Sequence, residues 1–309
     1  MSGPPLRFAG HVDLPEHQGK GGFDHAAVHA ASGHVYVAHT ANDSIDVFDP
    51  ARRRYLFSVP GLPGVAGALM SDEAELVFSS NRAANTIGVF APGPDPSVRI
   101  VDVGVRPNGL AYDHRRRLVL VANVGDPTVA GSHTLSMIDL AKDGRRTEIA
   151  VRGRTRWAVY APEEDLFFVN IMEPPEIVVV DPRQPDRIAR TMAIGHAGPH
   201  GLDFDEATHR LFCACDAGVL VTLDARSGKV LDEKPLSGVP DVVFFNRQRR
   251  HLYVAVGDPG VIEVFAASSM TRLATVETER GAHTTALSPA GNWVCAFLPL
   301  SHRVAMFEA

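Results

Sequence analysis

The chain has 309 residues, of which 45% are hydrophobic and 21% are charged, and its formal net charge is -6. This composition predicts a packed globular core, and the absence of basic blocks excludes the electrostatic footprint of a nucleic-acid-binding protein. No apolar run reaches the length of a membrane span, and the start MSGPPLRFAG has no apolar segment behind a basic one. We therefore expect a cytoplasmic protein that contacts neither membrane nor nucleic acid.

The three cysteines do not indicate a disulfide framework or a thiolate zinc site. Cys213, Cys215 and Cys295 are odd in number, form no CxxC pair and fall inside apolar strands. We expect buried free thiols, as is usual for unpaired cysteine.

Taken in chain order, the sequence repeats one unit seven times. Its clearest copy is HAGPHGLDFDEATHRLFCACD, residues 196–216, which predicts a loop that leads into two short antiparallel strands. A third strand follows each pair, from SIDVFDP in the first unit to RVAMFEA in the last. The residues that open the seven units are His25, Ala66, Asn108, Arg156, His200, Asp241 and His283. Their spacing of 41 to 48 residues is typical of propeller blades with four strands each.

A fourth, outer strand follows in six units, but the seventh unit ends with the chain at Ala309. The segment LRFAGHVDLP, residues 6–15, has the same character and no partner before it. We expect it to pair with the last strand and close the ring, because closure leaves only short protected sheet edges. The predicted fold is all-β: residues 1–309 form a single seven-bladed β-propeller closed by the N-terminal strand.

The ends of the second strands, HVYVAH, LVLVAN and HLYVAV, resemble those of the YVTN-type seven-bladed propellers, the group that includes YncE. This resemblance covers nearly the whole chain and implies the fold rather than a function. The segments PNGLA around Asn108 and VPDVV around Asp241 are similar to segments that carry metal ligands in the gluconolactonase propellers. A looser resemblance is to virginiamycin B lyase, a seven-bladed propeller in which a divalent metal and a histidine serve a ring-opening elimination.

The opening residues predict a site at one mouth of the central channel. The innermost strand of each blade runs along the channel, so the residue that opens it lies at one rim, and the second strand returns to the same rim. Four of these residues fall on adjacent blades and form the predicted metal ligand set: His25, His200, Asp241 and His283. Imidazole nitrogen and carboxylate oxygen suit a divalent ion such as Zn, Mn, Fe or Ni.

Other polar residues are expected around the same mouth. His39, on the blade of His25, is a fourth ligand or a hydrogen-bond partner that fixes a tautomer. Arg156 is suited to hold an anionic group in a bidentate geometry, and Glu173 in the loop NIMEPPE is a candidate acid or base. The catalytic candidates are thus Arg156, His39 and Glu173. The substrate-binding candidates are Asn108, Arg156, Trp157 and Asn170.

The sequence therefore predicts a metal-dependent enzyme that acts on a small anionic molecule. A Lewis-acidic ion would polarise a carbonyl or activate water, which fits lactone or ester hydrolysis and ring-opening elimination. The alternative is a non-catalytic, YncE-like binding or scaffold propeller whose rim engages a protein or peptide.

Overall fold

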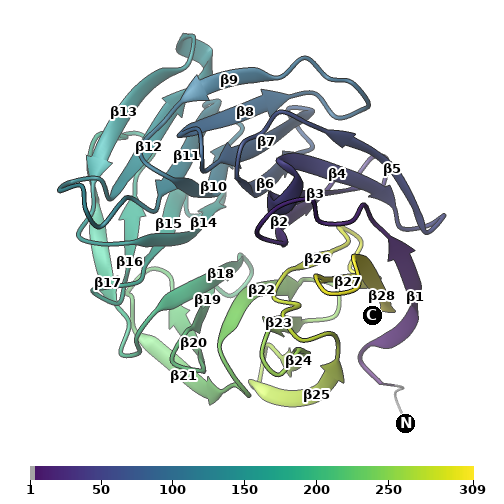
Figure 1. The fold of residues 1–309 in the computed structure, drawn as a ribbon. Helices are drawn as coiled ribbons and strands as arrows, with labels where there is room; N and C mark the ends of the chain where they lie inside the picture. The colour runs from purple at the N-terminus through teal and green to yellow at the C-terminus, as the bar shows by residue number, and fades with distance from the viewer. Residues whose placement is uncertain (1–3) are drawn as a thin grey trace.

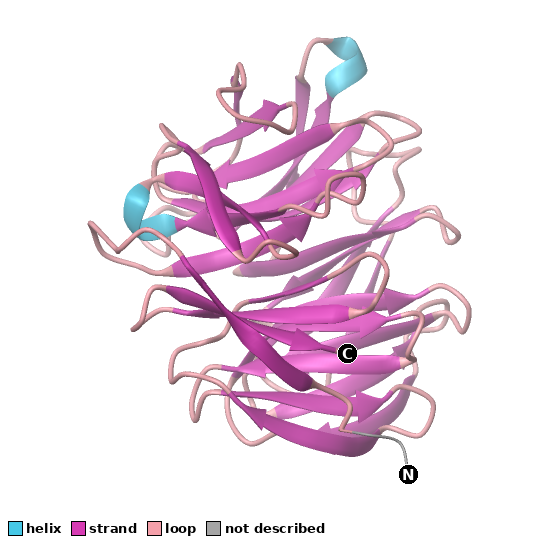
Figure 2. Ribbon diagram, turned by 90° about the vertical axis from the view of Figure 1, so that its right-hand side faces the viewer, coloured by secondary structure: helices cyan, strands magenta, loops and turns pink. Residues whose placement is uncertain are grey.

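The computed structural model describes residues 4–309, which form a ring of seven four-stranded antiparallel sheets around a central channel (Figure 1). This confirms the seven-bladed β-propeller. In six blades the strands follow one another in chain order from the channel outward. Figure 2 shows how little helix there is: two short 3-10 turns, η1 (Thr40–Asn42) and η2 (Leu140–Lys142).

The first four blades have their strands in this order, with the innermost strand first. Blade 1 contains β2 (Phe23–Val28), β3 (Val35–His39), β4 (Ser44–Asp49) and β5 (Arg54–Val59). Blade 2 contains β6 (Val65–Ser71), β7 (Leu76–Asn81), β8 (Thr86–Phe90) and β9 (Arg99–Asp102). Blade 3 contains β10 (Pro107–Asp113), β11 (Leu118–Asn123), β12 (Thr134–Asp139) and β13 (Arg145–Ala150). Blade 4 contains β14 (Thr155–Ala161), β15 (Leu166–Ile171), β16 (Glu176–Val180) and β17 (Arg190–Ala193).

The remaining blades complete the ring. Blade 5 contains β18 (Pro199–Asp205), β19 (Arg210–Cys215), β20 (Val219–Asp224) and β21 (Val230–Pro235). Blade 6 contains β22 (Pro240–Asn246), β23 (His251–Val256), β24 (Val261–Ala266) and β25 (Thr271–Glu277). Blade 7 contains β26 (Thr285–Leu287), β27 (Trp293–Leu298), β28 (Arg303–Glu308) and, on its outside, β1 (Arg7–Asp13).

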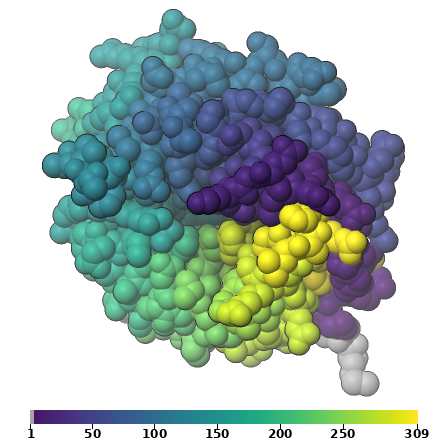
Figure 3. Space-filling model, viewed as in Figure 1, coloured from purple at the N-terminus to yellow at the C-terminus, as the bar shows by residue number. Residues whose placement is uncertain are grey.

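The pairing of β1 with β28 confirms the predicted closure. The two strands are antiparallel, with Val12 opposite Val304, and both of these valines are buried. Figure 3 shows the N-terminal segment in purple lying against the C-terminal segment in yellow. Because β1 comes from the opposite end of the chain, it fastens the first and last blades to each other.

Burial explains why the strands differ in composition. The second strands β3 and β11 are buried along their whole length, because both of their faces pack against neighbouring blades. Their sequences VYVAH and LVLVAN are accordingly apolar without alternation. The outermost strand of blade 6, β25, is largely exposed, and its sequence TRLATVE mixes polar with apolar residues. The core is therefore a set of apolar layers between the blades.

Two other expectations can be compared with the structure. Cys213, Cys215 and Cys295 are buried and free, as predicted. Within residues 4–309, no helix is long and apolar enough to cross a membrane. The cytoplasmic location stays a prediction.

Removal of residues 1–13 should destabilise the whole ring, because β28 would lose its outer partner and become an open sheet edge. We expect a lower melting temperature and concentration-dependent aggregation, measured by thermal unfolding and light scattering. Deletion of residues 1–5 is the matched control, since it removes neither Leu6, which is buried, nor β1. Equal melting temperatures for the two deletions would contradict the closing role of β1.

Candidate functional site

The innermost strands all begin at one rim, which we call the channel mouth. In blades 1 to 6 the inner strand pairs with the second strand, and the register of this pairing shifts just after the first residue of the inner strand. Such a bulge leaves a residue outside the ladder and redirects its side chain, and bulges are frequent beside functional sites. The residues at these irregularities include Asn108, Arg156, His200 and Asp241, so the predicted common position is a real structural feature.

Blade 1 requires a correction. Phe23 pairs with His39 at the end of the second strand, as Pro199 pairs with Cys215 in blade 5. The counterpart of His200 in blade 1 is therefore Asp24, and His25 is one position further along the strand. The repeat was aligned on the histidine, which shifted this blade by one residue.

His200 is held between carboxylates from two blades. Its Nδ1 lies 2.7 Å from Asp216 Oδ1, and its Nε2 lies 3.1 Å from Asp241 Oδ1. Arg156 Nη1 also lies 3.1 Å from that Nε2, and Arg156 Nη2 donates to Asp216 Oδ2 at 3.4 Å. These four side chains form one polar network across blades 4, 5 and 6.

The network sets the charge of its members. Burial opposes a charge on His200, but the carboxylates of Asp241 and Asp216 outweigh burial and raise the pKa of His200 to about 9. The nearby Arg156 guanidinium lowers the pKa of His200, but its single positive charge is outweighed by the two negative charges of Asp216 and Asp241. Burial also disfavours a charged Asp241, yet the imidazolium of His200 and its hydrogen bond hold the pKa of Asp241 well below its usual range. At neutral pH the pair is therefore an imidazolium and a carboxylate.

His283 lies on the other side of Asp241. Its Nδ1 donates to the carbonyl of Gly281 at 2.8 Å, and its Nε2 lies 3.9 Å from Asp241 Oδ2. A neutral imidazole with its proton on Nδ1 keeps a lone pair on Nε2. The side chain is 38% exposed, so water reaches this nitrogen.

Arginines gather on the opposite side of the mouth, on blades 2 to 4. Arg82 donates to Asn108 Oδ1 at 2.7 Å and approaches Asp24 Oδ2 at 3.5 Å. Arg106 and Arg154 precede the inner strands of blades 3 and 4, and their side chains make no hydrogen bond or ion pair within residues 4–309. Burial, followed by repulsion from the guanidinium groups of Arg156, Arg82 and Arg106, lowers the pKa of Arg154.

This side of the mouth is therefore positive and incompletely paired. The Nε atoms of Arg82 and Arg156 are buried without a hydrogen-bond partner. Buried donors of this kind are normally satisfied. A bound carboxylate or phosphate is the chemical group that would neutralise such a cluster, because guanidinium matches these anions with paired hydrogen bonds.

His25 and Trp157 form the floor of the mouth. They occupy equivalent positions on blades 1 and 4, and their rings face each other across the channel with centroids 4.0 Å apart. His25 Nε2 lies 3.5 Å from Asp24 Oδ1, but burial dominates and lowers the pKa of His25. The neutral ring suits an aromatic contact.

Three of the four predicted metal ligands gather at Asp241, which lies 3.1 Å from His200 Nε2 and 3.9 Å from His283 Nε2, but their donor atoms are not arranged around an ion. Within residues 4–309, no group of three His, Cys, Asp or Glu side chains is placed to hold an ion. Both nitrogens of His200 are already engaged, and the Arg156 guanidinium lies beside its Nε2, where an ion would have to bind. His25 is packed on Trp157. These residues do not fit a metal centre in this arrangement, and the metal stays a prediction without structural support.

His39 lies away from the mouth in a buried hydrogen-bonded chain. Its Nδ1 lies 2.6 Å from Asp46 Oδ2, and its Nε2 lies 2.7 Å from His17 Nδ1. His39 and Asp46 are fully buried. The chain connects the segment after β1 to blade 1, so His39 has a structural place and not the ligand or catalytic place predicted for it.

Three other residues predicted for the site, Asn170, Asn108 and Glu173, lie in three different environments. Asn170 is fully buried and donates to the carbonyl of His200 at 2.8 Å, so it positions the backbone of His200 and does not face a ligand. Asn108 is buried and accepts from Arg82. Glu173 is exposed on the hairpin after β15, and its carboxylate has no hydrogen-bond or ion-pair partner in the described chain.

Five residues of the mouth were missed by the sequence analysis: Asp24, Arg82, Arg106, Arg154 and Asp216. Arg82 and Asp216 directly follow the second strands of their blades, and Arg106 and Arg154 directly precede the inner strands. Alignment of the repeats on the strand ends would have found these four arginine and aspartate residues, because residues that flank equivalent strand ends share a rim.

Comparisons with known proteins support the fold. No protein-family model matches the chain, and no curated protein sequence matches it. Among solved structures, hydrazine synthase from Kuenenia stuttgartiensis is similar, with a TM-score of 0.80 and 14% sequence identity over 96% of this chain and 97% of that chain. At this identity the likeness shows the propeller fold alone. Membership of the YVTN-type family stays a prediction.

The charge state of His200 can be tested directly. Because its folded pKa of about 9 is above the usual 6.5, its contribution to stability is complete below pH 6.5 and is lost as the pH rises through 9. Imidazole titration by NMR should show His200 protonated at pH 7.5 and neutral above pH 10. In Asp241→Asn the titration should move toward 6.5. Asp258→Asn, which changes an exposed carboxylate paired with Arg280, should leave it unchanged.

The structural place of His39 makes a second prediction. His39→Ala removes the imidazole partner of the buried Asp46 carboxylate, which keeps only the hydroxyls of Ser44 and Ser58. We expect a loss of about 3 kcal/mol in the free energy of unfolding, measured by urea denaturation. The NMR titration of His200 should not change, because the two networks share no residue. A His39→Ala protein of unchanged stability would contradict this assignment.

Proposed function

We propose that the protein is an enzyme that acts at the channel mouth on a small anionic substrate, with His200 and His283 as the proton donor and acceptor. The observation that carries this proposal is the incompletely paired arginine cluster beside a histidine clamped by two carboxylates. Ester or lactone hydrolysis and ring-opening elimination are the reactions that these groups suit best.

The arginines provide the substrate site. Arg154 and Arg106 have no anionic partner in the described chain, while Arg156 stands between them and His200. A carboxylate or phosphate of the substrate would bind these guanidinium groups and supply the anionic partner that the cluster lacks. It would also orient the rest of the molecule toward Asp241 and the two histidines, and such positioning is itself a large part of catalysis.

The two histidines differ in their hydrogen-bond partners, which suits them for different roles. His200 carries a proton on each nitrogen at neutral pH because Asp216 and Asp241 favour the imidazolium. As the general acid it would turn its Nε2–H from Asp241 to the leaving oxygen when the substrate binds. His283 has its Nδ1 fixed on the carbonyl of Gly281 and presents Nε2 as the general base.

The proton transfers balance for either reaction. In hydrolysis, His283 takes a proton from water as the water oxygen bonds to the acyl carbon, and His200 protonates the leaving oxygen as the C–O bond breaks. In elimination, His283 takes a proton from carbon, a C=C bond forms and His200 again protonates the leaving oxygen. Neither route requires an oxidant or reductant.

The proposal can be tested with a matched pair of lactones. The probes are 5-oxotetrahydrofuran-2-carboxylate, which carries an anionic group, and γ-butyrolactone, which does not. Proton release in a pH-stat should show turnover of the anionic lactone, with a KM raised about tenfold in Arg154→Gln, equivalent to about 1.4 kcal/mol. His200→Gln should lower kcat by about 10²-fold. Arg187→Gln, an exposed change on the outside of blade 4, should alter neither constant.

The competing function is a non-catalytic binding propeller. The same arginines would then hold a ligand without turnover. Calorimetric binding of the carboxylate probe to the wild type but not to Arg154→Gln, with no proton release from either lactone, would favour this function. No binding and no turnover would refute both.

A further inference from the structure

A second cavity lies in the channel on the far side of His25 and Trp157 from the mouth. It has a volume of about 360 Å³, within the range of small-molecule sites. Its lining comes from the later residues of the inner strands and from the hairpins that follow them, such as Glu73 and Glu206. The polar residues of the mouth, Arg156, His200 and Asp241 among them, do not line it. It therefore opens at the opposite face of the propeller.

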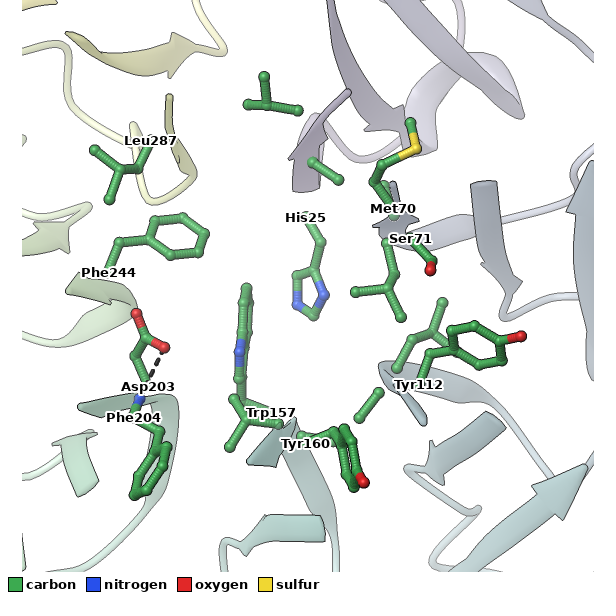
Figure 4. A pocket seen from close by; sticks show the side chains of 18 of the residues that line it. His25, Met70, Ser71, Tyr112, Trp157, Tyr160, Asp203, Phe204, Phe244 and Leu287 are labelled. Carbon is green, nitrogen blue, oxygen red and sulfur yellow. Dashed lines mark hydrogen bonds between the residues drawn. The ribbon is translucent and has the colours of Figure 1, made fainter. Parts of the chain in front are cut away.

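The walls of this cavity are rich in aromatic and apolar side chains. Figure 4 shows Trp157 beside His25, with Phe244 and Leu287 on one wall and Met70 and Tyr112 on another. Trp157 and Phe244 meet edge to face with ring centroids 6.1 Å apart. Aromatic faces attract organic cations through their negative electrostatic potential.

One carboxylate lies within this apolar wall. Asp203, on β18, accepts hydrogen bonds from the backbone N–H groups of Phe204 at 2.8 Å and Phe245 at 2.6 Å. It is only half-buried, because its exposed surface faces the cavity it lines. Burial raises the pKa of Asp203 to about 6, so the group still carries a negative charge above neutral pH.

That negative charge has no cationic partner in the described chain. Arg247 also lines the cavity, but its guanidinium is paired with Glu206 through contacts of 3.0 and 3.1 Å. An unpaired charge in apolar surroundings is unfavourable in free energy, and a cation bound beside it would offset this penalty. The exposed carboxylate of Glu73 adds negative charge at the entrance, which would attract cations.

We propose that this cavity binds a small organic ammonium ion with an apolar or aromatic body, whose charge pairs with Asp203 while its body packs on Trp157 and Phe244. The site is separate from the mouth, because the rings of His25 and Trp157, in contact with each other, lie between the two. It therefore does not depend on the reaction proposed above.

Trp157 provides a direct measurement. The chain has two tryptophans, so Trp293→Phe leaves Trp157 as the single tryptophan fluorophore. In this background we expect benzylamine to change the emission saturably at pH 8, and benzyl alcohol, which has the same ring and no charge, to bind at least about tenfold more weakly. Asp203→Asn should remove this preference by weakening benzylamine alone.

A second variant separates the site from misfolding and from binding elsewhere. Leu287→Trp places a larger side chain into the cavity; its own tryptophan adds fluorescence, so binding to this variant is measured by calorimetry. It should abolish benzylamine binding, while the His200 titration at the mouth stays unchanged. Equal affinity for benzylamine and benzyl alcohol, retention of the preference in Asp203→Asn, or undiminished binding in Leu287→Trp would each overturn the proposal.

Discussion

The close approach of the innermost strands around the channel is the constraint on which both sites depend. At Gly67, Gly109 and Gly201 a Cβ atom would collide with the backbone carbonyl of the next blade, so these positions accept only glycine. The equivalent positions on blades 1 and 4 carry His25 and Trp157, whose rings meet in the channel. The equivalent positions on blades 6 and 7 carry the smaller, buried side chains of Val242 and Thr284, so the two rings divide the channel into a polar mouth and an apolar cavity.

The mouth is divided by charge as well as by shape. Guanidinium groups gather on blades 2 to 4, while His200, His283 and Asp241 lie on blades 5 to 7. Arg156 connects the two sides through its contacts with His200 and Asp216. These side chains are carried by six different sheets, and each sheet is fixed by packing against its neighbours. The array is therefore pre-organised, and a ligand that supplies the missing negative charge would not have to reorganise it.

The two chambers favour opposite ligand charges for the same physical reason. In the mouth, cations outnumber their available partners, and in the cavity the Asp203 carboxylate has none. Around the less exposed groups, Arg156 and His200 in the mouth and Asp203 in the cavity, the surrounding protein excludes much of the solvent that would otherwise screen the charge. A propeller presents two rims of one channel, and in this chain guanidinium groups gather at one rim while the cavity toward the other rim holds an unpaired carboxylate.

The sequence by itself determined the fold. Strand pairs repeated every 41 to 48 residues, a missing outer strand in the seventh unit and an unpartnered LRFAGHVDLP are enough to predict seven blades and their closure, because strand pairing and burial follow local periodicity. It also placed Arg156, His200, Asp241 and His283 at one rim. What it left undetermined was the single-residue register.

Only the tertiary structure decided that Asp24 and not His25 occupies the common position, since a bulge of one residue changes which side chain faces the mouth. The tertiary structure also paired His200 with Asp216 and Asp241, drew His39 into a buried chain with Asp46, and turned Asp203 into the cavity. These contacts join residues on different strands and blades at distances of a few ångströms. A repeat pattern specifies which rim a residue reaches, but the packing of one sheet on the next specifies which groups touch.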